Sequence, residues 1–177
     1  MENHNELIKS EMNQLLTSNS LNNSLQSIQA MGAMKGKAVP TLRETIRNNE
    51  DSDLKTMAII VLGEIGESAS VAIPEVLNEL ILATNDQIRM ASSLYLVKIG
   101  NKSIHSLKEV ISNNTDDEAR FWCCWALAMI DPNEMDEGST SILLKVEKKT
   151  QDIIKKSAAQ EALAKLIGNT IKNNDFK

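Results

Sequence analysis

The chain of 177 residues has few of the side chains on which most catalytic and metal sites depend. It contains two histidines, two cysteines and only 3% aromatic residues. His4 and His105 lie far apart in the sequence, and no histidine is followed by glutamate, so a histidine-rich metal centre is not predicted. We therefore expect no metal, no cofactor and no catalytic residue.

The chain also lacks an excess of basic residues and a long apolar run. Its formal net charge of −5 repels phosphate backbones, which disfavours nucleic acid as a partner. No 18 consecutive residues are apolar, and the N-terminal segment has no basic stretch before an apolar run, so neither a membrane span nor a signal peptide is expected. The adjacent Cys123 and Cys124 make no disulfide framework, which indicates a reducing compartment. We expect a cytoplasmic protein that does not bind membranes.

What the sequence does contain is an internal repeat. "LKTMAIIVLGEIG" from Leu54 aligns with "IRMASSLYLVKIG" from Ile88 at an offset of 34 residues, and "ARFWCCWALAMID" from Ala119 follows at an offset of 31. Weaker copies start at Leu21 and Lys155. Apolar residues recur at helical spacing in each copy, which predicts one helix per unit. One position is small in four of the copies: Ala58, Ser92, Cys123 and Ala159.

A second helix is predicted after the first in each central unit. The segments "AVPTLRETI", "AIPEVLNEL" and "SIHSLKEVI" share apolar residues spaced by three and then four. Pro40 and Pro74 fall in the first turn of this helix, where the missing amide proton costs nothing. Gly66 and Gly100 end the preceding helix. Each unit is therefore a helical hairpin, and stacking of hairpins supplies the buried surface that one pair lacks.

These patterns predict an all-α fold, an α-solenoid of about five stacked helical hairpins. We call the two helices of each hairpin A and B. The expected organisation is a capping helix over residues 1–20, a repeat domain over 21–168 and a polar tail over 169–177. The expected repeat units are 21–50, 51–85, 86–115, 116–150 and 151–168.

The second unit has a basic residue at Lys55, an alanine at Ala58, "LGEIG" over 62–66 and "AIPEV" over 72–76. These residues resemble a HEAT repeat of the short bacterial type, also called the phycobilin-lyase HEAT-like repeat. The similarity covers residues 20–168. It implies an armadillo-like superhelix but little about function, because such repeats occur in scaffolds, regulatory subunits and a few enzymes.

A series of basic residues lies near the start of successive A helices. In similar repeats this position bridges to an acid of an adjacent unit, and aspartates lie nearby in each unit here. We expect structural pairing and no ligand. The basic residues are Lys55, Arg89, Arg120 and Lys156, and the aspartates are Asp53, Asp86, Asp117 and Asp152.

The segment "FWCCWALAMI" at 121–130 holds both tryptophans and both cysteines. The repeat places Cys123 at the small packing position, where cysteine acts as a compact apolar residue. Trp122 and Trp125 align with apolar positions of the other units, so one interpretation is that their rings fill a wide gap between helices. Another is that Trp122 reaches the surface as an interface anchor. A stacking platform for a planar ligand is a third.

A partner is expected on the concave side of the solenoid, which B helices usually line. The candidate residues are those out of phase with the buried stripe of each B helix, together with Trp122. They lean acidic, which favours a protein or peptide with a basic or polar surface. The predicted protein-binding residues are Thr41, Arg43, Glu44, Glu75, Asn78, Ser106, Lys108, Glu109 and Trp122.

The sequence thus favours a non-enzymatic protein–protein interaction module: a scaffold, a regulatory subunit or a toxin-neutralising partner. Two alternatives come from the resemblance. One is a bilin-lyase-like enzyme or chaperone, whose chromophore binding would depend on Trp122 or Cys124. The other is a nucleic-acid-binding protein similar to HEAT-like alkylpurine glycosylases, which the acidic charge disfavours. The oligomeric state stays open.

Overall fold

The computed structural model describes residues 2–17 and 21–175, and the side chains of residues 5–14, 17, 26–28, 30–34 and 36–173. Throughout the described residues the chain is helical, with no strand, which confirms the all-α class. The chain forms two compact units, Met1–Ile99 and Gly100–Lys177, here called the N-terminal and C-terminal units. Their boundary falls inside the expected unit 86–115.

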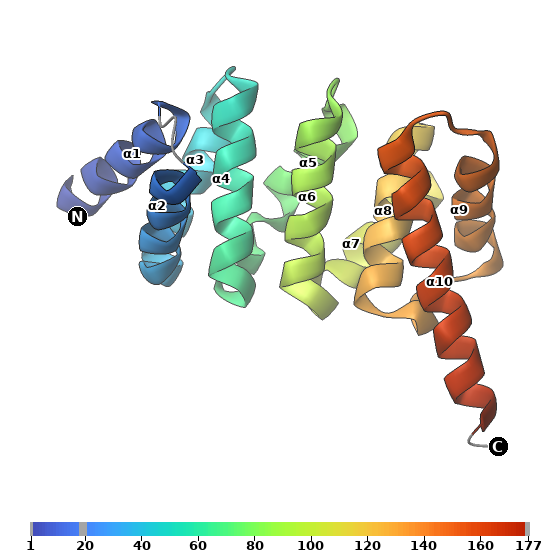
Figure 1. Ribbon diagram of the computed structural model, residues 1–177. Helices are drawn as coiled ribbons and strands as arrows, with labels where there is room; N and C mark the ends of the chain where they lie inside the picture. Colours follow the sequence, from blue (N-terminus) through green and yellow to red (C-terminus); the bar gives the residue numbers. More distant parts are fainter. Residues whose placement is uncertain (1, 18–20, 176–177) are drawn as a thin grey trace. The chain divides into compact units, whose positions relative to one another are not determined.

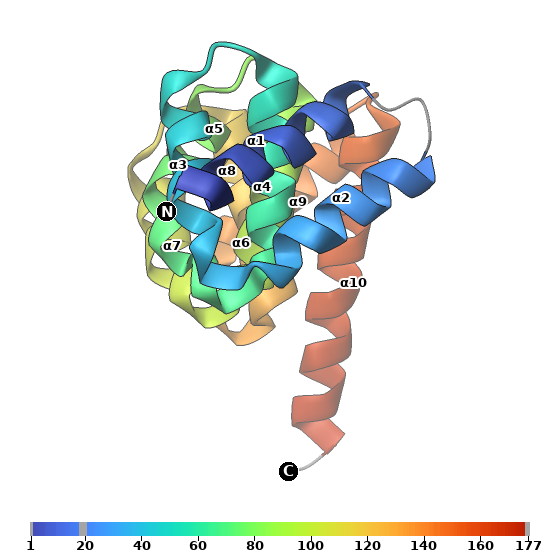
Figure 2. The ribbon, with the colours of Figure 1, turned by 90° about the vertical axis from the view of Figure 1, so that its left-hand side faces the viewer.

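The N-terminal unit contains six α-helices among its described residues (Figure 1). α2, α4 and α6 are A helices in successive contact, and α3 and α5 are B helices. α1 lies against α2 and also contacts α4 (Figure 2). Met1 and residues 18–20 of the expected capping segment lie outside the described residues. The bounds are α1 Glu2–Thr17, α2 Leu21–Ala33, α3 Val39–Asn48, α4 Ser52–Ile65, α5 Ile73–Leu82 and α6 Asp86–Ile99.

The C-terminal unit contains α7 to α10. α8 contacts both α7 and α9, and α10 packs against α8 and α9. α10 continues to Asp175, so most of the segment expected to be a tail is helical, and residues 176–177 lie outside the described residues. The bounds are α7 Ile104–Asn113, α8 Asp117–Ile130, α9 Glu137–Lys149 and α10 Ile153–Asp175. Short 3-10 helices lie at Lys35–Lys37, Gly66–Ala72, Gly100–Ser103 and Pro132–Glu134.

The helix boundaries follow from side chains and glycines that the sequence places between helices. Aspartates accept hydrogen bonds from the free amides at helix starts: Asp51 from Asp53 N at 2.8 Å and Asp116 from Ala119 N at 2.6 Å. Gly66 has φ of 71° and Gly100 has φ of 73°, a region that side chains with a Cβ rarely adopt. The chain therefore turns at both glycines.

The shared small position of the repeat lies in the core. Ala58, Ser92, Cys123 and Ala159 are all fully buried. A larger side chain at this position would separate each A helix from its neighbours, because protein interiors leave few voids to absorb it. The repeat register read from the sequence is therefore the packing register of the helices.

The basic residues at the start of the A helices are held largely by main-chain groups. Arg89 donates from Nε and Nη2 to Ala83 O, at 3.1 and 2.7 Å, and Arg120 donates from Nε to Ile111 O at 3.0 Å. Both carbonyls lie at the C-terminal end of the preceding B helix, where carbonyls have no helical partner and carry partial negative charge. Lys55 instead pairs with Glu79, at 2.8 Å. Arg120 also pairs with the nearby Asp117, at 3.8 Å, so Lys55, Arg89 and Arg120 contact acids and helix ends inside the protein.

The segment Ser52–Leu82 is the one stretch of the described chain that is long and apolar enough in composition to cross a membrane. The turn at Gly66 divides it into α4 and α5, and Leu62 and Leu80 are buried inside the N-terminal unit. Packing in the protein core thus accounts for part of its apolar character, since 39% of its most apolar window is buried.

Candidate binding groove between α4 and α6

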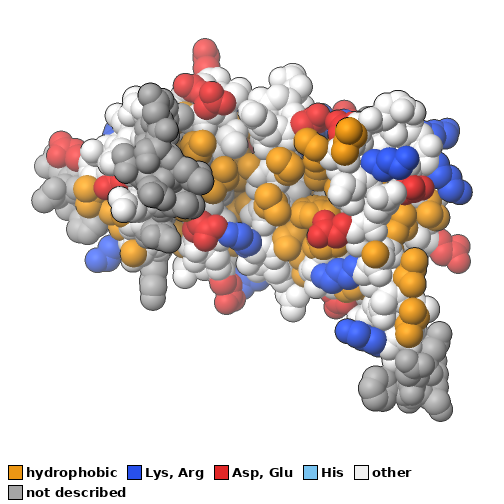
Figure 3. Space-filling view, viewed as in Figure 1, with side chains coloured by type: hydrophobic (Ala, Val, Ile, Leu, Met, Phe, Trp, Pro, Cys, Tyr) orange, Lys and Arg blue, Asp and Glu red, His pale blue; other side chains and the backbone are white. Residues whose placement is uncertain are grey.

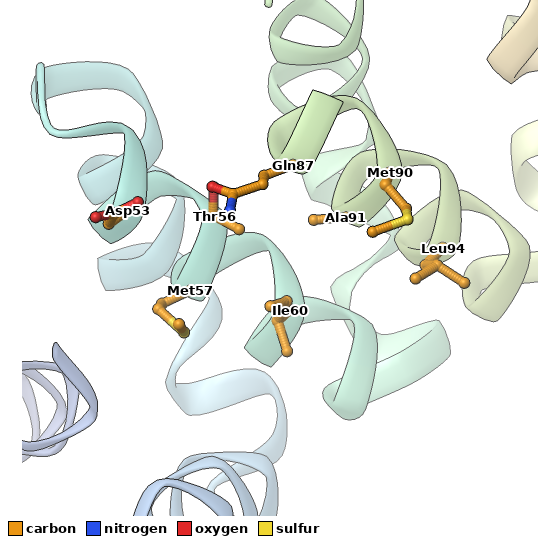
Figure 4. Close-up of a pocket in the computed structure, with 8 residues that line it drawn as sticks. All are labelled: Asp53, Thr56, Met57, Ile60, Gln87, Met90, Ala91 and Leu94. Atoms are coloured by element: carbon orange, nitrogen blue, oxygen red, sulfur yellow. The ribbon is translucent and has the colours of Figure 1, made fainter. Parts of the chain in front are cut away.

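A groove of about 460 Å³ lies between the N-terminal halves of α4 and α6 (Figure 4). Met57 and Ile60 line it from α4, and Met90 and Leu94 line it from α6. Met90 is 37% and Leu94 is 45% exposed, which is high for large apolar side chains. The remaining lining residues are Asp53, Thr56, Gln87 and Ala91. The lining is mostly apolar, with polar groups at one end, as is common in sites that bind apolar groups.

The two helices approach closely beyond the groove, around Gly63 and Tyr95. A Cβ built on Gly63 would lie 3.6 Å from Tyr95 Cα, so the glycine allows near contact of the two backbones there. Tyr95 is buried and donates from its hydroxyl to Ala69 O at 2.8 Å, which fixes this end. Toward the helix starts, the small side chain of Ala91 leaves the space between the helices unfilled (Figure 4).

The repeat register relates this groove to the two tryptophans. Trp122 stands at the position of Met57 and Ala91, and Trp125 at the position of Ile60 and Leu94. Between α8 and α10 the corresponding gap is filled, because both indole rings are buried and Trp125 Nε1 donates to Glu161 on α10, at 3.2 Å. The same gap is thus closed by rings in the C-terminal unit and open in the N-terminal unit.

Apolar side chains are exposed over α4 and α6 on the face shown in Figure 3. The charged groups near the mouth of the groove are mainly acidic: Asp53 lines the groove, and Asp51 and Asp86 stand at the starts of the two helices. At the other end Lys98 pairs with Glu64. A partner with basic groups beside an apolar surface fits this distribution.

The predicted B-helix residues of the N-terminal unit form a different surface. Glu75 pairs with Arg43, at 2.6 Å, and with Arg47. Burial opposes ionisation of Glu75, but the hydrogen bonds from the two arginines outweigh it and lower its pKa. Glu44 and Asn78 are exposed. This surface therefore presents an internally paired cluster beside two exposed polar side chains.

Thr41 does not belong to an exposed surface, contrary to the prediction. It is buried and donates from Oγ1 to Asn5 Oδ1, at 2.7 Å. The helical pattern of α3 indicated an outward position, but α1 supplies a partner that the pattern of α3 alone does not reveal.

The predicted protein-binding residues of the C-terminal unit differ in their exposure. Ser106 is half-buried, Glu109 is exposed, and Lys108 pairs with Glu134. Trp122 is only 2% exposed, so it cannot be a surface anchor, and the prediction of its role in binding was wrong. Its ring packs edge-on against Phe121 and Trp125, with centroids 5.1 and 6.0 Å away. The interpretation that the rings fill a gap is the one the geometry supports.

The two cysteines lie in the same packed segment. Both are fully buried and form no disulfide. Burial raises the pKa of the Cys124 thiol to about 12, against a smaller opposing effect of its hydrogen bond with Ser139, and burial also raises the pKa of Cys123. Among the described residues, no group of histidines, cysteines and acids is placed to hold a metal ion. Both thiols are therefore shielded from solvent and protonated near neutral pH.

We predict that a maleimide reagent leaves Cys123 and Cys124 unmodified in the native chain at pH 8 and modifies both in urea. Because the thiols of the unfolded chain ionise above their usual pKa of 9.0 while Cys124 stays protonated to about pH 12, the free energy of unfolding should fall as pH rises above 9. Urea titrations at neutral and alkaline pH measure this fall. A Cys123→Ala, Cys124→Ala double variant should show a smaller fall. Rapid modification of the native chain would contradict the prediction.

The repeat pattern predicts that the groove positions are packing positions. The position of Met57 and Ala91 and that of Ile60 and Leu94 are apolar in every central unit, and the partner surface was expected on the B helices. The sequence feature that could have indicated the groove is a difference in side-chain size at one repeat position, where tryptophan in one unit corresponds to methionine and alanine in two others.

No family model matches the chain. It is 33% identical over 156 residues to the uncharacterized protein SkfG of Bacillus subtilis strain 168, an alignment that covers 86% of this chain and 89% of SkfG. An identity of this size over nearly the whole of both chains indicates common descent and a common fold. The chain belongs to the family of SkfG.

Proposed function

We propose that this protein is a HEAT-like α-solenoid that binds another protein without catalysing a reaction, and that the groove between α4 and α6 is the contact site. The observation that carries the proposal is the unfilled gap. The chain closes the equivalent space between α8 and α10 with two indole rings, but between α4 and α6 it leaves exposed methionine and leucine side chains. Exposed apolar surface in a groove is costly in water unless a partner covers it.

The alternation of A and B helices supports the solenoid part of the proposal. α2, α4 and α6 are in successive contact, as are α8 and α10, and each B helix lies between two A helices in the sequence. Repeats of this kind generate extended surfaces rather than enclosed cavities. Such surfaces suit a scaffold, a regulatory subunit or a neutralising partner in the cytoplasm.

The chemistry of the groove favours a protein partner with apolar side chains flanked by basic ones. Methionine side chains are flexible and polarisable, so Met57 and Met90 can adapt to apolar groups of different shape. Asp53 and Asp86 stand where they can attract lysine or arginine. The same acidic rim repels nucleic acid.

The proposal predicts that filling the groove removes binding. In a Met57→Trp, Ile60→Trp double variant the rings should occupy the space as they do between α8 and α10. Tagged chains are used to capture proteins from an extract of the native cell, and the captured amounts are compared by mass spectrometry. We expect loss of at least about 90% of the specific partner, because a filled central pocket removes the main anchors.

A Val71→Trp, Leu82→Trp double variant is the matched control, since it adds two rings at exposed apolar positions outside the groove. It should capture as much partner as the native chain. If overpacking unfolds the first variant, Leu94→Glu tests the same site with a smaller change. Equal capture by the native chain and all folded groove variants would refute the groove as the contact site.

A further inference from the structure

α10 is apolar on two opposite faces. One face packs against α8 and α9 and buries Ala159 and Ala162. The opposite face leaves Ile153, Ile167 and Ile171 exposed by 84, 62 and 55%. A helix that is apolar on opposite sides usually has a partner on each side. Among the described residues, α8 and α9 pack on the side of Ala159 and Ala162, and α9 also reaches Gln160, whose Nε2 donates to Glu147 Oε1 at 3.3 Å.

The exposed isoleucines form a regular stripe. Residues 153, 164, 167 and 171 fall on one face of a helix with 3.6 residues per turn. Ala164 and Gln160, also exposed, lie between the isoleucines, so the stripe is shallow at its centre and bulky at both ends. Apolar side chains are visible along α10 in Figure 3. A stripe of this shape is suited to insertion into a groove.

The charge of α10 is opposite to that of the groove. The helix carries four lysines and two acidic residues, although the whole chain has a net charge of −5. Two of the lysines have partners in their own unit, because Lys155 pairs with Glu118 and Lys165 donates to Met129 O. Lys172, beside Ile171, is exposed, as is Lys156. The groove between α4 and α6 is apolar and has Asp53 at one end and Asp86 nearby. The two surfaces therefore match in polarity and in charge.

We infer that the α10 stripe of one copy binds in the α4/α6 groove of a second copy. Ile167 and Ile171 occupy the space between Met57 and Leu94, and Lys172 lies against the acidic end of the groove at Asp53. The inference rests on the proposed function, because it uses the same groove and names a second copy of the chain as its occupant. Because every copy of the chain carries both surfaces, the groove and the stripe are always present at equal concentration. Self-association therefore needs no second protein.

The contact is heterologous, since a groove on one copy meets a helix on the next. A pair joined by one such contact therefore retains an unused groove on one copy and an unused stripe on the other, unless the two contacts are reciprocal. In either arrangement, a chain with a defective groove still has a working stripe, and a chain with a defective stripe still has a working groove. This property makes the contact testable by mixing.

The test uses purified full-length chains in analytical ultracentrifugation over a wide range of concentrations. The native chain should associate with rising concentration. An Ile167→Glu, Ile171→Glu stripe variant and a Leu94→Glu groove variant should each be monomeric, with association weakened by at least about a hundredfold because each buries a charge in an apolar contact. An equimolar mixture of the two variants should form a one-to-one complex.

Charge reversal tests the orientation. Lys172→Glu and Asp53→Lys should each weaken association by about tenfold, and the two together in one chain should restore it, since the attraction is then reversed and not lost. Leu82→Glu, an exposed apolar position outside both surfaces, is the matched control and should leave association unchanged. Circular dichroism establishes that each variant is folded.

A native chain that is monomeric at every concentration would overturn the inference, as would association that survives the stripe variant. Two folded variants that stay monomeric when mixed would also overturn it. The proposed function is tested by a different measurement, the capture of protein from an extract. If the purified chain is monomeric but the filled-groove variant loses a protein from the extract, the groove binds a different protein and only the self-association is wrong.

Discussion

Trp122→Ala should lower the free energy of unfolding of the C-terminal unit by about 3–5 kcal/mol, the usual cost of removing a large aromatic side chain from a core. The ring is 2% exposed and is held between Phe121 and Trp125, so its removal leaves a cavity that neighbouring side chains on α8 cannot close. A loss of this size is a large part of the stability of a small domain. Urea denaturation followed by the fluorescence of Trp125 measures it, because both tryptophans belong to this unit.

Trp122→Phe is the matched control and should cost less than about 1.5 kcal/mol. The indole Nε1 of Trp122 is buried without a hydrogen-bond partner among the described residues. Phenylalanine removes this unsatisfied donor, which offsets part of the lost volume. A Trp122→Ala variant that keeps native stability but loses partner capture would show that the ring acts at a surface, contrary to the packed position described above.

Arg89→Met should lower the free energy of unfolding of the N-terminal unit by about 2–3 kcal/mol. The methionine retains the apolar length of the side chain but leaves Ala83 O without the two charge-assisted hydrogen bonds that Arg89 supplies, at 3.1 and 2.7 Å. Ala83 is buried and lies at the end of α5, where the positive guanidinium also interacts favourably with the helix dipole. Thermal unfolding followed by circular dichroism measures the change.

Lys55→Met provides the comparison at the same position of the preceding unit. The Lys55–Glu79 pair is partly buried, with side chains 20% and 15% exposed, and Lys55 donates a single hydrogen bond to Glu79. Because water still reaches and screens both groups, we expect Lys55→Met to cost less than Arg89→Met, about 1 kcal/mol. Equal losses of unfolding free energy in Arg89→Met and Lys55→Met would mean that the hydrogen bonds from Arg89 to the end of α5 stabilise the unit no more than an ordinary ion pair does. Arg89→Lys should recover only part of the loss, because an ammonium cannot donate from two fixed nitrogens.

Much of the fold was predictable because the repeat encodes local preferences. The alternation of A and B helices follows from apolar residues at helical spacing, and the boundaries follow from Asp51, Asp116, Gly66 and Gly100. These signals act over a few residues, so each unit can be interpreted alone. The burial of Cys123 and Ala159 was likewise predictable, because the repeat register transfers a packing position from one helix to the next.

The surface was less predictable. The pattern of a helix shows which face is apolar, but which neighbour covers that face depends on segments far away in the sequence. Asn5 on α1 covers Thr41, and α10 closes the gap at Trp125, while the equivalent gap at Ile60 and Leu94 stays open. The groove thus arises from packing between two helices and has no motif of its own.

The sequence by itself determined the helices, their order, their boundaries and the small residues at which they approach one another. Only the tertiary structure decided that Trp122 is core, that Arg89 caps α5, and that Met90 and Leu94 stay exposed in a groove between α4 and α6. The physical reason is that helix formation and capping depend on neighbours within four residues, whereas burial depends on the distance and side-chain volumes of helices brought together by folding.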